Sequence, residues 1–458
     1  MTMQRRRFLA AGSAALAAGL GGLSPALMSL PAWGATTDGY RALVCVFLFG
    51  GMDNHDTVIP YDSASYNGWA GIRSSLVNAQ GGSRSRDNLL PLSPLEDTFG
   101  GRQFALPPEM PGLSGLFQSG NAALVGNVGP LLRPTDAASF NADSVPLPSR
   151  LFSHNDQQAT WMSGAPEGAR FGWAGLFGDL MRQAGANGDG TFAAITTGGA
   201  DLLITGRETT PYQVVGEDGA VETFLLQEVD GGLQSLLTTH LRAERYAGDN
   251  LLGRDLAARI RGSFDANLRY NQAALSTGSS GVTFPASELG VQLGAVASAI
   301  AARDALGVSR QVFTVGMGGF DTHSAQARDL PALQRQLDEA IVAFHSAMQA
   351  MGLGSDVALF TASDFGRTLA INGDGTDHGW GGHQFVVGGG VRGQRIFGGL
   401  PPAELGHSRD AGSGRLIPDV SVEQFAAPLG RWFGLGNEEI AAVFPNLKAF
   451  DGPPALFG

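Results

Sequence analysis

The run Leu43-Val44-Cys45-Val46-Phe47-Leu48-Phe49 is followed at once by Gly50-Gly51-Met52-Asp53-Asn54-His55-Asp56. An apolar run of this length that ends at glycines is typical of a strand buried on both faces. Strands covered on both faces occur mainly in the parallel sheets of α/β proteins. The stretch therefore predicts a central strand with polar side chains gathered at its carboxyl end.

The same kind of segment recurs along the chain. Five more short apolar runs predict buried strands: Ala122–Gly126, Phe192–Thr197, Val312–Gly316, Val357–Ala362 and Phe385–Gly388. Helical patterns lie between and after them: Met110–Gln118, Gly172–Gln183, Leu289–Ala305, Asp329–Met351 and Val422–Phe433. Strands that alternate with helices predict an α/β fold with a mostly parallel central sheet and helices on both faces.

One region breaks this alternation. Residues from about 215 to 280 carry two helical stretches, Glu222–Arg245 and Asn250–Ala274, followed by the Ser/Gly link Ser276–Gly281. We interpret them as a helical insertion in a single domain that spans residues 36–458. The lone cysteine, Cys45, cannot form an internal disulfide and is expected in the core.

The first 35 residues have the composition of a leader. Arg5-Arg6-Arg7-Phe8-Leu9 precedes a weakly apolar Ala/Gly/Leu stretch to about Leu30. Small residues near Gly34 and Ala35 then resemble a cleavage site. Charged, apolar and small-residue regions in this order predict a twin-arginine signal peptide, and therefore a periplasmic or secreted protein. A membrane anchor would need about 20 strongly apolar residues, whereas Gly, Ser and Pro interrupt this stretch.

The charge of the chain restricts its partners. The whole chain has a net charge of −12. Arg5, Arg6 and Arg7 are the only charged residues among the first 35, so removing them leaves 27 basic against 42 acidic residues, a net charge of −15. An acidic surface of this size disfavours nucleic acid and anionic membranes as partners. No later segment is long and apolar enough to be expected to span a membrane.

Titratable side chains collect where the predicted strands end. Asp53 follows the first strand, Asp321 and His323 follow Val312–Gly316, and Asp364 follows Val357–Ala362. A Gly-rich segment after them contains His378 and His383. Chemistry in open α/β sheets lies beyond the carboxyl ends of the strands, and carboxylate with imidazole suits Zn, Mn or Fe, whereas carboxylate alone suits Mg or Ca. These six residues therefore predict a divalent metal site.

Several of these residues also have a structural interpretation. Asp56 and Asp374 are expected to be turn or cap residues. His383 is expected either to bind the metal or to satisfy a buried loop carbonyl. Arg367 is expected either to bind an oxyanion of a substrate or to form an ion pair with Asp364 or Asp377.

A second polar segment, Ser153–Gly164, is expected to open a helix. Ser153 and Asp156 have the spacing of a capping box. Because a helix N-terminus favours anions, either residue could also be a nucleophile placed there. Ordinary capping and catalysis both stay open for Ser153, and Thr160 is a further hydroxyl in the same segment.

Four motifs carry a family resemblance. They are Phe49-Gly50-Gly51-Met52-Asp53, Phe320-Asp321-Thr322-His323, Ser363-Asp364-Phe365-Gly366-Arg367-Thr368 and Gly375-Thr376-Asp377-His378-Gly379. Together they resemble a family of exported bacterial proteins catalogued as domain of unknown function 1501. That family is similar in outline to the alkaline phosphatase and sulfatase superfamily, so the resemblance implies an alkaline-phosphatase-like sheet.

The resemblance also implies roles for individual residues. Asp53 matches the metal ligand after the first strand, Asp321 and His323 match ligands of one metal, and Asp364 matches a ligand of a second. Phe365 departs from the pattern, because the superfamily has a histidine there. His378 is the best match for the last histidine ligand, with His383 as the alternative. The segment Ser153–Gly164 corresponds to the region of the nucleophile, where Ser153, Asp156 and Thr160 are candidates and Asp156 is also a candidate metal ligand. A metal-bound water is the other candidate for the attacking group.

The function implied is a metal-dependent hydrolase of phosphate or sulfate esters, with one or two ions of Zn, Mn, Mg or Ca. Arg367 would then bind an oxygen of an anionic small-molecule or polymer ester. The alternative is a non-catalytic form of the fold that binds a polymer, a surface ligand or a partner protein. The resemblance further offers a second exported protein, encoded nearby, as a partner.

Overall fold

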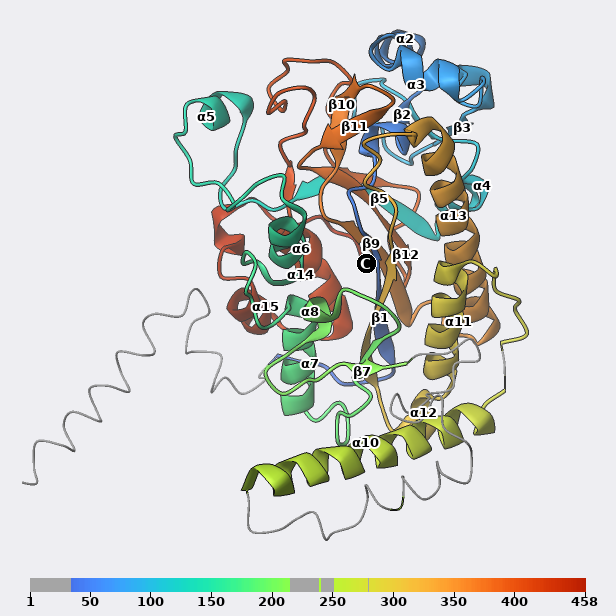
Figure 1. Ribbon diagram of the computed structural model, residues 1–458, viewed down its shortest axis with the longest axis vertical. Coiled ribbons are helices and arrows are strands. Elements are labelled where there is room, and N and C mark those ends of the chain that lie inside the picture. The colour runs from blue at the N-terminus through green and yellow to red at the C-terminus, as the bar shows by residue number, and fades with distance from the viewer. Residues whose placement is uncertain (1–33, 215–238, 240–250, 279) are drawn as a thin grey trace, which may run out of the picture.

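A nine-stranded, mostly parallel sheet forms the centre of the molecule, as the sequence predicted (Figure 1). The computed structural model describes residues 34–214, 239, 251–278 and 280–458. The strands are β1 (Arg41–Leu48), β5 (Ala122–Gly129), β6 (Ala194–Thr196), β7 (Tyr212–Gln213), β8 (Arg310–Met317), β9 (Val357–Ser363), β12 (Gly382–Gly388), β13 (Ile396–Gly398) and β14 (Val420–Ser421). Their order is β13-β5-β12-β9-β1-β8-β6-β7, with β14 also paired to β5. Only β12 runs antiparallel to its neighbours.

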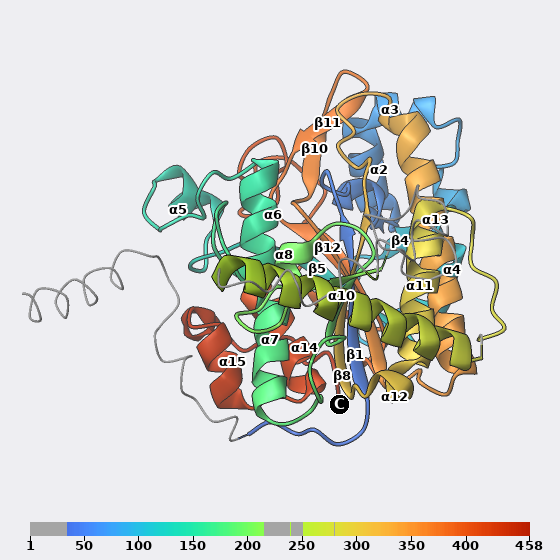
Figure 2. The ribbon, with the colours of Figure 1, turned by 60° about the horizontal axis from the view of Figure 1, so that its bottom comes forward.

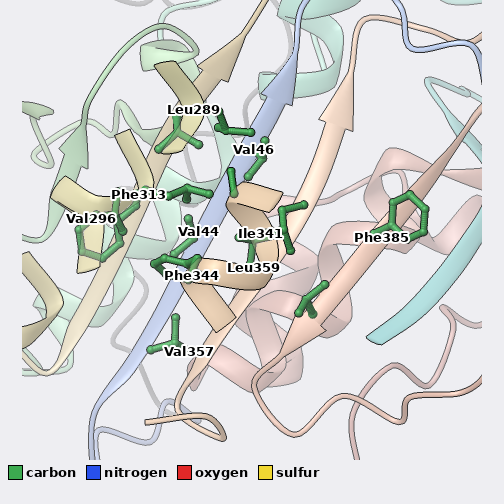
Figure 3. Close-up of a cluster of buried hydrophobic side chains, with 14 of the residues drawn as sticks. Val44, Val46, Leu289, Val296, Phe313, Ile341, Phe344, Val357, Leu359 and Phe385 are labelled. Carbon is green, nitrogen blue, oxygen red and sulfur yellow. The ribbon is translucent and has the colours of Figure 1, made fainter. Parts of the chain in front are cut away.

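The central strand β1 divides its side chains between two hydrophobic cores. Val44 and Val46 belong to one core, whereas Cys45 and Phe47 belong to the other. Successive side chains of a strand point to opposite faces of the sheet, which is why the unbroken apolar run fills both cores. Figure 3 shows the first core, where Val44 and Val46 lie among residues of α11 and α13. Cys45 is buried, as expected.

Helices cover the two faces of the sheet (Figure 1). One face carries α4 (Pro111–Gln118), α11 (Glu288–Ala301) and α13 (Gln326–Ala350). The other carries α6 (His154–Ser163), α7 (Trp173–Gln183), α8 (Asp201–Ile204), α14 (Val422–Phe433) and α15 (Asn437–Val443). The α/β fold class predicted from the alternating pattern is confirmed, and one helical prediction, Leu289–Ala305, is split because α12 (Arg303–Leu306) follows α11 as a separate turn.

Smaller elements surround the carboxyl edge of the sheet. After β1 come η2 (Asn54–Asp56), α2 (Ser63–Ile72), α3 (Ser74–Ala79) and η3 (Arg86–Asn88), with a three-stranded sheet of β2 (Ile59–Pro60), β4 (Phe104–Leu106) and β3 (Leu90–Pro91). A hairpin of β10 (Arg367–Asn372) and β11 (Gly375–His378) follows β9. Two short helices, α5 (Ala137–Asn141) and η6 (Leu447–Ala449), complete the described elements.

The predicted insertion is described only in its second half. The helix α10 (Leu251–Ser276) forms where Asn250–Ala274 was expected, and it crosses one end of the molecule beside α11 and α12 (Figure 2). Its Tyr270 is buried and lies 5.5 Å, centroid to centroid, from the ring of Tyr212 on the edge strand β7. The first stretch, Glu222–Arg245, lies outside the described residues apart from Thr239.

The described chain begins at the amino edge of the sheet. The backbone N–H of Gly34 donates to Glu439, and Arg310, the first residue of β8, donates to the carbonyl of Thr36. Residues 1–33, which hold nearly all of the predicted leader, lie outside the described residues, so the leader stays a prediction. Among the helices that are described, none has the length and hydropathy needed to cross a membrane.

Candidate metal centre

The carboxyl ends of three parallel strands meet at one edge. Leu48 of β1 pairs with Met317 of β8 on one side and with Ser363 of β9 on the other. The segments that follow these strands therefore lie together, which the sequence predicted. The backbones after β1 and β8 are in close contact at Gly50 and Asp321. Gly50 has a φ of 111°, and a Cβ placed on it would lie 2.3 Å from the amide nitrogen of Asp321, so only glycine fits there.

Three side chains converge at this edge into what we call the His/Asp cluster: His154, Asp321 and His378. One ligand atom from each lies within 4.8 Å of the others. The His378 Nε2 atom is 3.2 Å from Asp321 Oδ1, and the His154 Nε2 atom is 3.4 Å from Asp321 Oδ2. The Asp321 side chain is 43% exposed and the two imidazoles are 28% and 23% exposed, so the cluster can be reached from solvent.

His154 comes from the first turn of α6. Its Nδ1 atom lies 2.6 Å from Asp364 Oδ2. A carboxylate accepts here, so Nδ1 carries the proton and Nε2 is left to face Asp321. The hydrogen bond to Asp364 raises the pKa of His154 above its usual value, although burial acts in the opposite direction.

His378 ends the β10–β11 hairpin and is held in the same way. The hairpin closes through Gly373, which has a φ of 64°, and its pairing sets His378 opposite Arg367. The Nδ1 atom of His378 is 2.7 Å from the carbonyl oxygen of Phe152. A carbonyl can only accept, so Nδ1 donates. Burial lowers the pKa of His378, which favours the neutral ring with a lone pair on Nε2.

His323 adjoins the cluster on its solvent side. Its Nε2 atom is 2.8 Å from His378 Nε2 and 3.1 Å from Asp321 Oδ1. Its Nδ1 atom is 3.5 Å from Asp377 Oδ1. A third imidazole therefore presents Nε2 toward Asp321.

Asp321 is held in place by a buried arginine. Arg367 Nη1 donates to Asp321 Oδ1 at 2.7 Å and to the carbonyl of Gly50 at 3.2 Å, and its other nitrogens donate to Thr376. Burial acts to raise the pKa of Asp321, but the hydrogen bond and charge of Arg367 outweigh it and lower the pKa. The ion pair expected for Arg367 with Asp364 or Asp377 is thus formed with Asp321 instead, and its guanidinium is fully buried.

Asp364 lies behind His154 and is fully buried. Its Oδ2 atom accepts from His154, from Gln158 Nε2 at 2.9 Å and from the N–H of Gly50 at 3.3 Å. Its Oδ1 atom is buried and has no hydrogen-bond partner among the described residues. The sequence predicted Asp364 as a metal ligand, whereas in the structure its carboxylate is buried and hydrogen-bonded to His154.

Phe365 packs against both imidazoles. Its ring centroid is 4.9 Å from that of His154 and 4.7 Å from that of His378. A Cβ on Gly51, which has a φ of 87°, would lie 2.5 Å from this ring. The aromatic ring therefore occupies the inner side of the cluster.

Asp53 and His383 are not part of the cluster. The Asp53 carboxylate is buried in an ion pair with Arg73, with Nη1 2.7 Å from Oδ2. His383 on β12 accepts the N–H of Asn127 at its Nδ1 atom, and burial lowers its pKa to about 3. Both side chains are therefore engaged in structural contacts, although His383 accepts an N–H of β5 where a hydrogen bond to a loop carbonyl was expected.

The predicted nucleophiles face away from the cluster. Ser153 Oγ donates to Asp156 Oδ2 at 2.9 Å, and Asp156 also lies 3.5 Å from Arg150 Nη1. Ser153 is the N-cap residue of α6 but makes no side-chain cap hydrogen bond, so the expected capping box does not form. Asp156 follows His154 by two residues, about 200° around the helix. Thr160 donates to the carbonyl of Asp156.

His154 was missed as a candidate when the sequence was interpreted. It stands beside Ser153 and Asp156, whose spacing predicts a capping box. The available signal was the spacing of His154 and Gln158, since residues four apart share one face of a helix. Both reach Asp364.

A family match covers the segment that carries most of the cluster. Residues 239–444 match the family described as "Protein of unknown function (DUF1501)". This segment is therefore similar to that family. The resemblance inferred from the four motifs is confirmed over this range, which includes Asp321, His323 and His378. No curated protein matches the chain.

Solved structures with similar chain paths are distant. The chain is similar to the C-terminal periplasmic domain of EcEptC from Escherichia coli in complex with Zn, at 9% identity over 88% of this chain and 84% of that chain, with a TM-score of 0.33. It is also similar to PsFucS1 sulfatase from Pseudoalteromonas sp., at 10% identity over 90% and 70%, with a TM-score of 0.35. The lipoteichoic acid synthase LtaP from Listeria monocytogenes gives 9% identity over 88% and 76%, with a TM-score of 0.34.

Proposed function

We propose that the protein is an exported hydrolase of phosphate or sulfate esters that binds a divalent metal with His154, Asp321 and His378, and with His323 as a fourth ligand. The observation that carries the proposal is the shared orientation of the imidazoles. His154 and His378 each have Nδ1 fixed by an acceptor and each present Nε2 to one carboxylate.

The donor set fits such an ion. Metal-binding histidines almost always donate their second N–H to a carboxylate or a backbone carbonyl, and Asp364 and the Phe152 carbonyl supply these acceptors. Imidazole nitrogens with one carboxylate suit Zn, Mn or Fe better than Mg or Ca. The Nε2 atoms of His323 and His378 are 2.8 Å apart. With an ion bound, both would coordinate it and would no longer hydrogen-bond to each other.

The surrounding residues would prepare the site for an anionic ester. A divalent ion bound here would supply a Lewis acid that polarises an ester oxygen and lowers the pKa of water. Arg367 holds Asp321 in position from beneath. Phe365 excludes water from the inner side, so a substrate would approach from the exposed side of Asp321 and His323.

The attacking group is proposed to be water. Ser153 and Asp156 hydrogen-bond to one another, and Thr160 donates within its own helix. These contacts support a nucleophile that is not one of the side chains expected from the sequence.

Metal content and turnover test the proposal together. Protein purified from the periplasm is expected to contain Zn, Mn or Fe and to hydrolyse chromogenic phosphate or sulfate esters, whereas Asp321→Asn and His378→Ala should lose both metal and turnover. His345→Gln on α13 is the matched control and should keep both. A metal-free wild type, or full metal content in Asp321→Asn, contradicts the metal site. Stoichiometric metal without turnover on any phosphate or sulfate mono- or diester contradicts the hydrolase and favours the binding role.

Export and partners are proposed from the sequence. The Arg5-Arg6-Arg7 leader supports the twin-arginine route to the periplasm or beyond. The acidic charge supports a substrate that is not nucleic acid, and the family resemblance supports a second exported protein as a partner. Fusing residues 1–35 to a reporter that is exported only when folded tests the route, and loss of export with Arg5→Lys and Arg6→Lys together is the expected result.

A further inference from the structure

The most informative departure from the implied two-metal site lies at Asp53. The sequence resemblance implies Asp53 as the metal ligand after the first strand, and an aspartate and a histidine at positions 364 and 365 as ligands of a second ion. In the structure each of these positions has a different role, and the inference drawn from them rests on the proposed metal function of the His/Asp cluster.

Asp53 has no lone pair to spare. Its Oδ2 atom accepts from Arg73 Nη1 at 2.7 Å and from Gln326 Nε2 at 2.5 Å. Its Oδ1 atom accepts from Arg73 Nη2 at 3.1 Å and from the N–H of His55 at 3.0 Å. A carboxylate offers about four lone-pair positions, and four donors occupy them.

Arg73 is equally committed to this position. It lies between α2 and α3, and its side chain is 1% exposed. Besides Asp53, it donates to the carbonyl of Leu369 from Nε at 3.2 Å and to that of Thr368 from Nη2 at 2.8 Å. The forked contact of a guanidinium with a carboxylate is specific in geometry, so a permanent cation is already bound where the second ion would be.

Phe365 removes the other ligand. Its ring lies against His154 and His378 and within contact of Gly51, so an apolar ring fills the space next to Asp364. Asp364 keeps one unpartnered oxygen, Oδ1. A single oxygen, with Asp53 saturated and Phe365 beside it, does not make a second divalent site.

We infer that the chain binds one divalent ion, at the His/Asp cluster, and that the guanidinium of Arg73 replaces the second ion by neutralising Asp53. The residues implied by the resemblance thus do not fit a two-metal centre. The substrate would meet one divalent ion, and the Asp53 side of the site would serve to hold the loop after β1.

Metal stoichiometry tests this inference. Wild-type protein loaded with Zn and freed of excess by gel filtration is expected to hold one Zn per chain by elemental mass spectrometry. The double variant Asp53→Leu with Arg73→Met replaces the buried pair with apolar side chains, a change that often preserves folding, and should also hold one. Asp321→Asn should hold none.

The outcomes separate this inference from the proposed function. Two Zn per chain in the wild type overturns the inference and leaves the metal-dependent hydrolase standing. No Zn in the wild type overturns both. Loss of Zn from a double variant whose circular dichroism matches the wild type also overturns the inference, because it would make Asp53 a ligand. If the double variant does not fold, the wild-type stoichiometry alone decides.

Discussion

Single residues fix the geometry of the His/Asp cluster through contacts that the motifs do not display. The carboxylates expected from the sequence all lie near the carboxyl edge of the sheet, but their roles divide. Asp321 faces the imidazoles, Asp364 orients one of them, and Asp53 forms an ion pair. The division depends on Arg73, Arg367 and His154, whose approach to these acids is tertiary and therefore cannot be predicted from spacing along the chain.

Asp364→Asn tests the orienting role. The variant keeps an oxygen acceptor for His154 but loses the charge behind it, and loss of an outer partner of a metal-bound histidine typically costs 10- to 100-fold in affinity. We expect Zn affinity to fall by about that factor while the circular dichroism is unchanged. Asp374→Asn, in the hairpin turn, removes a carboxylate that accepts only from the Ala325 N–H and is the matched control. Equal Zn affinity in both variants would show that Asp364 does not orient His154.

Gly51→Ala tests the position of Phe365. A Cβ there would meet the ring at 2.5 Å on a backbone with a φ of 87°, so both a clash and backbone strain are expected. The free energy of unfolding should fall by about 2 kcal/mol or more, and Zn affinity should fall with it. Gly318→Ala, where a Cβ would have open space, should change neither by more than about 0.5 kcal/mol. Equal unfolding midpoints in denaturant for the two variants would contradict this packing.

Whole elements were more predictable than their contacts. The positions of the strands could be predicted, because a strand buried on both faces needs an unbroken run of apolar residues. In β1, for example, Val44 lies in one core and Cys45 in the other. The 3.6-residue pattern gave α7, α13 and α14 to within a few residues at each end. The hairpin β10–β11 was not predicted, because its strands are short and polar, yet it carries His378 to the cluster.

The first turn of α14 carries a carboxyl group in an apolar cavity. Glu423 lies beside Thr160, Trp173 and Phe444, and none of the residues lining the cavity is a second titratable group. Its Oε2 atom is buried without a partner. Burial raises the pKa of Glu423 from 4.5 to about 7.

The pH dependence of folding should follow from that shift. The folded protein binds more protons than the unfolded chain between pH 4.5 and about 7, so stability falls as the pH rises through this window. At about 1.4 kcal/mol per pKa unit, the loss is at most about 3.5 kcal/mol. We expect Glu423→Gln to be increasingly more stable than the wild type from pH 5 to pH 8, as measured by urea unfolding. Glu438→Gln, an exposed glutamate in α15, should show no such trend, and a constant difference for Glu423→Gln would exclude the mechanism.

At the scale of the whole molecule, the cluster joins three segments that are far apart in the sequence. Asp321 follows β8, His154 opens α6 on one face, and His378 ends a hairpin outside the sheet. The fold class could be predicted because alternating strands and helices allow few arrangements. The arrival of His154 beside Asp321 and His378 could not, because the segment between β5 and α6 holds only the short helix α5 and no pattern in it directs α6 to this edge.

Chelation should therefore lower the stability of the whole domain. A ligand that binds only the folded state adds about 4 kcal/mol when its concentration is a thousandfold above Kd. We expect EDTA to lower the unfolding temperature of the wild type and Zn to restore it. Asp321→Asn should unfold at the same temperature with or without EDTA. An unchanged wild-type midpoint in EDTA would mean that the ion does not stabilise the folded chain.

The ion pair between Arg73 and Asp53 makes the loop after β1 independent of the supply of metal ions. A guanidinium is made with the polypeptide and cannot be captured by a competing organism or a chelating siderophore. The loop after β1 therefore keeps its balancing charge whether or not metal ions are available. With the one ion proposed for the His/Asp cluster, each chain would need half the metal of a two-ion centre.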